Sequence, residues 1–115
     1  MGLYTTAKWA FPQLLSRKSV PGSKPTFIVT GGGLYKNPQP THLSLSLNKA
    51  AQFNLASSLT KIYEPQGIHV GVVVVNKAIT YEEKNANPTR IAQEYWNMYE
   101  QEEGKWEQVI DMGYW

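Results

Sequence analysis

The sequence predicts an α/β fold centred on a short parallel sheet. Two apolar runs rich in β-branched residues, "TFIVT" at 26–30 and "IHVGVVVV" at 68–75, are typical of buried strands. Between them, residues 42–64 place apolar side chains at spacings of three and four, which is the period of an amphipathic helix. A strand, a helix and a second strand in this order form a βαβ unit with parallel strands.

The start of helix 42–64 carries a mixed signal. The stretch "LSLSLNK" at 43–49 alternates like a strand, but its leucines continue in phase with the apolar positions of the helix that follows. Thr41 comes directly before the helix and is expected to cap its N-terminus. The segment "PQG" at 65–67 is a strong stop signal. The stretch is therefore interpreted as the first two turns of the helix.

Further elements flank the βαβ unit. Residues 3–15 carry a helical apolar stripe, in which Pro12 is expected to kink the helix or limit its first segment. The glycines at 31–33 allow the chain to turn sharply after the first strand. Asn87-Pro88 has the order of a helix cap and a first-turn proline, so another helix begins there. The final "WEQVIDMGYW" is expected to form a short strand or a docked tail.

The composition limits the class of protein. The 115 residues suffice for one small domain, and 42% apolar with 17% charged residues suits a folded chain. No apolar run approaches the roughly 20 residues that span a bilayer, and the N-terminus lacks a signal-peptide layout. Cysteine is absent, and the two histidines are far apart, so no metal site is expected. A soluble, cytoplasmic protein without membrane contact is the expectation.

The charge is divided between the two halves of the chain. The net charge is +7 up to residue 63 and −5 from Glu64 onward. The basic residues are dispersed and no nucleic-acid-binding motif accompanies them, so no nucleic-acid partner is expected. Either the two halves face each other, or acidic partners of the first half lie outside this chain.

The order of these elements resembles the second half of the short-chain dehydrogenase/reductase family. "MGLYTTAKWAFPQLL" is similar to the helix before the family's fifth strand, and "TFIVTGGG" to that strand and its turn. "SLSLNKAAQFNLASSLTKIYEPQGIHVGVVVV" is similar to the active-site helix and sixth strand. "NPTRIAQEYWNMYEQ" resembles the C-terminal segment of a divergent branch. The resemblance covers essentially the whole chain and implies a partial Rossmann-like domain, residues 1–115, without the N-terminal dinucleotide-binding half.

The family's catalytic residues are mostly absent. The family uses a Tyr-x-x-x-Lys pair, in which the lysine lowers the tyrosine pKa and holds the nicotinamide ribose. Lys49 matches the lysine, but Leu45 stands at the tyrosine position and Gly32 at the serine position. The asparagine position would precede Met1, and Asn76-Lys77 stands where the family has Pro-Gly.

The cofactor turn of the family is also missing. Its Gly-x-x-x-Gly-x-Gly turn supports the pyrophosphate at a helix N-terminus, whereas "TGGGLY" leads into a proline-containing loop. The resemblance therefore implies no cofactor for this chain alone, and NAD or NADP only if the missing half is supplied. It also implies an open sheet edge beside strand 26–30.

Several residues remain as candidates for chemistry. The catalytic candidates are Lys49 and His42, and the cofactor-binding candidates are Lys49 and Gly32. The substrate-pocket candidates lie near the implied active site or on the last helix: Tyr35, Ser44, Ser46, Tyr95 and Trp96. Each has an ordinary structural alternative, namely a solvated lysine, a loop or cap residue, or an aromatic side chain that packs in the core or at an oligomer face.

Three functional hypotheses follow. The first is a truncated or degenerate oxidoreductase-like protein that does not transfer hydride by itself. The second is a non-catalytic interaction protein, which forms a homo-oligomer through helices 3–15 and 42–64 or binds a complementary N-terminal half. The third is a small non-redox enzyme, such as an isomerase or cyclase, that reuses the substrate pocket.

Overall fold

The computed structural model describes residues 2–75 and 87–112. Helices and strands alternate, as the sequence predicts: α1 (Gly2–Arg17), β1 (Thr26–Gly31), α2 (Leu43–Tyr63), β2 (His69–Val74), α3 (Pro88–Glu100) and β3 (Val109–Asp111). The predicted α/β class and partial Rossmann-like sheet are confirmed. Within the described ranges, no helix is both long enough and apolar enough to cross a membrane.

The sheet is parallel, with the strand order β1-β2-β3. All six residues of the central strand β2 are buried, which confirms the prediction from its continuous apolar sequence. Val109 pairs with Val72 in the short strand β3. The C-terminal segment therefore forms a strand, one of the two alternatives that the sequence left open.

Strand β1 is less buried than its sequence suggests. Val29 is the one buried residue of the strand, and Thr30 is exposed. The physical reason is its place in the sheet: β2 pairs with one side of β1, and no other described strand pairs with the opposite side. The expectation of a buried strand is wrong for most of β1, whereas the open edge agrees with the resemblance.

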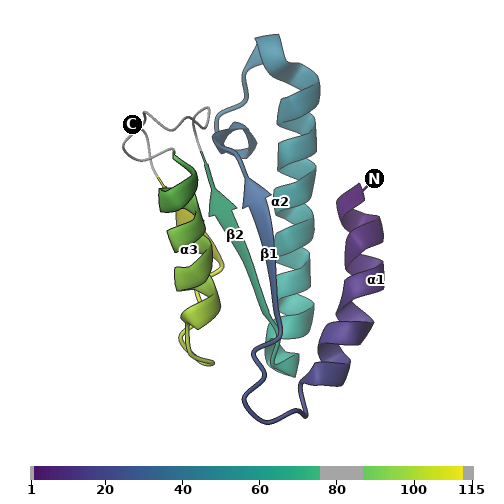
Figure 1. The fold of residues 1–115 in the computed structure, drawn as a ribbon. Coiled ribbons are helices and arrows are strands. Elements are labelled where there is room, and N and C mark those ends of the chain that lie inside the picture. The colour runs from purple at the N-terminus through teal and green to yellow at the C-terminus, as the bar shows by residue number, and fades with distance from the viewer. Residues whose placement is uncertain (1, 76–86, 113–115) are drawn as a thin grey trace.

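Helices cover the sheet on both faces (Figure 1). On the face with α1 and α2, two apolar clusters contain Val70, Val72 and Val74 of β2 together with residues of both helices and β1. The intervening Gly71 meets the fully buried Met98 of α3 on the other face. Alternate residues of β2 thus contact opposite layers, as the pleat of a strand requires.

The structure decides two of the expectations about helix starts and stops. Helix α1 continues through the solvent-exposed Pro12, so this proline does not limit the helix, one of the two alternatives that the sequence left open. Thr41 is not the cap of α2, because residues 40–42 form a 3₁₀ turn and His42 occupies the cap position without a side-chain bond. Asn87 does cap α3: its Oδ1 accepts a hydrogen bond from the Arg90 backbone N–H at 2.8 Å.

Candidate functional site

The first candidate site lies beyond the C-terminal end of β1, an edge where open parallel sheets commonly bind ligands. Gly32 follows the strand in an extended conformation. A Cβ at this position would lie 3.8 Å from Cε of Lys49 and 3.7 Å from the carbonyl oxygen of Val75, which is ordinary contact. The structure thus places the half-buried lysine stem beside the glycine, with room for a Cβ atom.

Lys49 has a modest set of contacts. Its Nζ donates a hydrogen bond to Oε1 of Gln52 at 3.5 Å. Leu45 lies one helical turn earlier on the same face of α2 and is 48% exposed. The position where the resemblance places a proton-transferring hydroxyl is therefore apolar and open to solvent. Lys49 therefore supplies a cation at this site, and the apolar Leu45 supplies no acid or base beside it.

Of the other candidates near this end of the sheet, two make contacts within the fold and two are exposed to solvent. Tyr35 stacks on Phe53, with ring centroids 4.0 Å apart and planes 8° apart. The hydroxyl of Ser46 is buried and accepts a hydrogen bond from the Gln39 backbone N–H at 3.3 Å, which ties the preceding loop to α2. His42 and Ser44 are exposed at the start of the helix. No described contact joins His42 to Lys49.

The two aromatic candidates on α3 contact different parts of the molecule. The hydroxyl of Tyr95 is hydrogen-bonded to that of Thr30, near the C-terminal end of β1. Trp96 is 54% exposed and contacts the ring of Tyr99 instead. The structure therefore brings Tyr95, but not Trp96, to the same end of β1 as Gly32.

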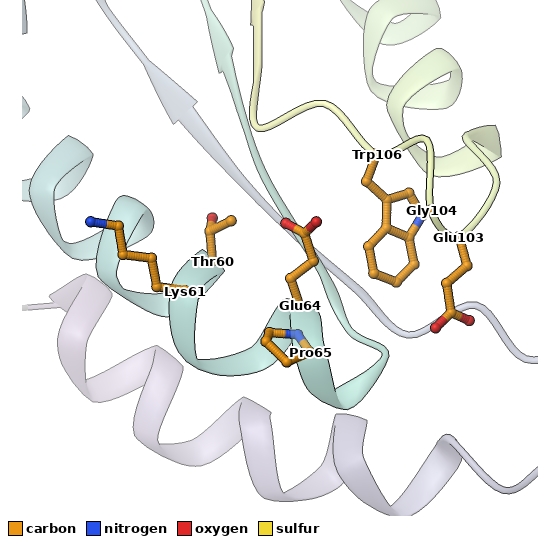
Figure 2. Close-up of a pocket in the computed structure, with 7 residues that line it drawn as sticks. All are labelled: Thr60, Lys61, Glu64, Pro65, Glu103, Gly104 and Trp106. Carbon is orange, nitrogen blue, oxygen red and sulfur yellow. The ribbon is translucent and has the colours of Figure 1, made fainter.

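A second hollow lies near the other end of the sheet, between the C-terminal end of α2 and the loop after α3 (Figure 2). Its volume is about 410 Å³, and its walls include Thr60, Glu64, Glu103 and Trp106. The sequence interpretation missed this site. An isolated tryptophan in a polar segment was the available signal, but the opposite wall of the hollow comes from residues 60–65, which lie about forty positions earlier in the sequence.

Metal chemistry has no support in the described part of the chain. No group of three or more His, Asp or Glu side chains is placed to hold a metal ion among those residues. The Asn76-Lys77 position, where the resemblance places Pro-Gly, lies outside the described residues.

Comparisons with known proteins give information about the fold. No protein-family model and no curated protein matches the sequence. Among solved structures, the crystal structure of a short-chain dehydrogenase from Rhodopseudomonas palustris is similar, with a TM-score of 0.78 and 15% sequence identity. The match covers 97% of this chain and 46% of that chain, so the present chain spans about half of that protein's length. The chain therefore has a partial Rossmann-like α/β fold similar to part of a short-chain dehydrogenase.

Proposed function

We propose that this chain is a short-chain dehydrogenase-like half-fold that does not transfer hydride by itself. The observation that carries the proposal is that the side chain of Lys49 lies next to Gly32. The lysine of the implied catalytic set is beside the strand end, while Leu45 and Gly32 replace the tyrosine and serine. Oxidoreductase ancestry with lost redox catalysis accounts for both the retained fold and these replacements.

The described residues do not fit a complete dinucleotide. A pyrophosphate site of this fold needs a glycine turn that leads directly into a helix N-terminus. Here the glycines lead into a 3₁₀ turn at Gly33–Tyr35 and then a loop, and α2 begins only at Leu43. Lys49 retains an ammonium group suited to a ribose hydroxyl or to an anionic ligand. NAD or NADP binding therefore requires a second half that supplies the glycine turn.

The proposed loss of cofactor binding has a direct test. Titration of NADH or NADPH with the purified chain, followed by cofactor fluorescence, is expected to show no saturable binding in the micromolar range. An intact short-chain dehydrogenase under the same conditions serves as the positive control. Saturable micromolar binding by residues 1–115 would contradict the proposal. An in-frame upstream continuation encoding a strand and a glycine-rich turn would support truncation.

A second function, association through α1 and α2, is favoured by the surface between these helices. A hollow of about 400 Å³ lies there, lined by Tyr4, Ala51, Asn54, Leu55 and Ser58. Tyr4 is 52% exposed. An apolar concavity between two helices suits a helix from a second copy. The open edge of β1 likewise suits a strand from a complementary N-terminal half.

Association through this surface is expected to give a dimer or larger species in sedimentation experiments at low micromolar concentration. Ser58→Arg is expected to weaken the dimer by at least about tenfold, because it introduces an unpaired charge into the contact. Ser16→Arg is the matched control on α1 outside the hollow. Both serines are exposed and donate only a local hydrogen bond, to Asn54 and Gln13 respectively. A stable wild-type monomer, or equal effects of the two variants, would argue against this interface.

A further inference from the structure

The hollow between α2 and the loop after α3 is separate from the site around Lys49. Thr60 and Glu64 come from the end of α2 and the turn after it, next to the beginning of β2. Gly32, in contrast, follows the C-terminal end of β1. Because the strands are parallel, these two sites lie at opposite ends of the sheet. An inference about this hollow is therefore independent of the proposed function.

The indole of Trp106 forms a fixed wall of the hollow. Its Nε1–H donates a hydrogen bond to the carbonyl oxygen of Gln101 at 3.2 Å. The ring is parallel to that of His69, with centroids 5.0 Å apart and planes 1° apart. These contacts hold the indole in one orientation before any ligand arrives. A binding surface that is already ordered loses less conformational entropy when a ligand binds.

The hydrogen bonding of His69 fixes the ring on which this indole stacks. His69 is 2% exposed, and its Nε2 lies 2.9 Å from the carbonyl oxygen of Glu107. Because a carbonyl oxygen only accepts, Nε2 carries the hydrogen in this bond. Nδ1 has no hydrogen-bond partner among the described residues. His69 is not among the residues that line the hollow, so its buried ring supports the indole of Trp106 from behind and does not contact a ligand there.

The charges around the hollow are predominantly negative. Glu64 directs its carboxylate toward the side of the hollow that holds Trp106, whereas Lys61 directs its ammonium group away (Figure 2). Neither Glu64 nor Glu103 forms an ion pair within the described ranges, and the nearby Lys105 pairs with Glu102 at 3.9 Å. The C-terminal end of α2 contributes the negative end of the helix dipole.

We propose that this hollow binds an organic cation, a primary or quaternary ammonium group, against the indole of Trp106. The π face of tryptophan attracts such a cation, and the carboxylates of Glu64 and Glu103 supply the counter-charge. The volume of about 410 Å³ lies in the range of small-ligand pockets. The two carboxylates repel anions, and they do not attract a neutral molecule of the same shape.

Choline and its neutral isostere 3,3-dimethylbutan-1-ol test this proposal in a pair of NMR titrations. Choline is expected to shift the indole N–H signal of Trp106 and the amides of residues 60–64 in a saturable way, and less so as salt is added. The neutral isostere is expected to leave these signals in place. The double variant Glu64→Gln/Glu103→Gln is expected to weaken choline binding by about tenfold, since two exposed charge contacts are removed.

Glu102→Gln is the matched control, because this carboxylate lies on the same loop but pairs with Lys105 and does not line the hollow. It is expected to leave choline affinity within about twofold of the wild type. The proposal fails if choline produces no saturable shift at Trp106, if the neutral isostere binds equally well, or if the double glutamine variant binds choline as the wild type does. A failure here leaves the NADH and sedimentation results unaffected.

Discussion

Replacing Phe11 with alanine is expected to lower the free energy of unfolding by about 3–5 kcal/mol. Phe11 is 2% exposed and belongs to the core cluster that joins α1 to the sheet. Its ring stacks on that of Tyr63 in α2, with centroids 4.1 Å apart, and contacts that of Phe27 in β1 at 4.9 Å. Alanine removes both ring contacts and leaves a cavity where three elements meet.

Urea denaturation at a fixed protein concentration measures this loss. Because a domain of this size has a total stability of about 5–15 kcal/mol, the variant is expected to be marginally folded. Trp9→Ala is the matched control on the same helix: Trp9 is 69% exposed, so its loss is expected to change stability by no more than about 0.5 kcal/mol. Equal stabilities of the two variants would contradict the packing of α1 described here.

Hydrogen exchange separates two ways in which Phe11→Ala could act. If α1 detaches alone, its amides lose protection while those of β2 keep it. If the fold unfolds as one unit, both lose protection together. The position of Phe11 between α1, α2 and β1 favours the second result. Protection that persists throughout α1 would show that the helix is held by other contacts.

The sequence was informative where local signals decide the structure. The spacing of apolar residues predicts α2 because each turn of a helix depends on nearby residues. Gly67 ends the 3₁₀ turn at Glu64–Gln66 that follows α2, with a positive φ of 86°. Asn87 is identifiable as a cap for the same reason, since its partner is three residues away. The continuous valines of β2 likewise predict burial on both faces.

The features that the sequence did not predict depend on contacts between distant segments. The exposure of β1 follows from its place at the sheet edge, which its own sequence does not specify. Whether the C-terminal segment forms a strand depends on pairing with β2. The wall of the second hollow requires Trp106 to stack on His69, and no periodicity within either segment encodes that contact. Thr41 was a plausible cap in sequence, but a 3₁₀ turn moves the cap position to His42.

Gly71 gives the second large expected effect, because the side chain of Met98 in α3 packs directly against β2 there. A methyl group at Gly71 would overlap Sδ of Met98 and lie 2.7 Å from its Cε. Met98 is fully buried, so its side chain has little space into which to move. Gly71→Ala is therefore expected to lower the free energy of unfolding by about 1–3 kcal/mol through overpacking.

A double-mutant cycle tests the cause. Met98→Ala alone is expected to cost about 2–5 kcal/mol, because it leaves a cavity beside Gly71. The added methyl of Gly71→Ala fits into that cavity, so the double variant is expected to lose less than the sum of the two single losses by about 1–3 kcal/mol. Gly32→Ala is the control: its new Cβ would meet no atom closer than 3.7 Å, and stability is expected to stay within about 0.5 kcal/mol. Strict additivity in the cycle would show that Met98 is not the residue that requires glycine at position 71.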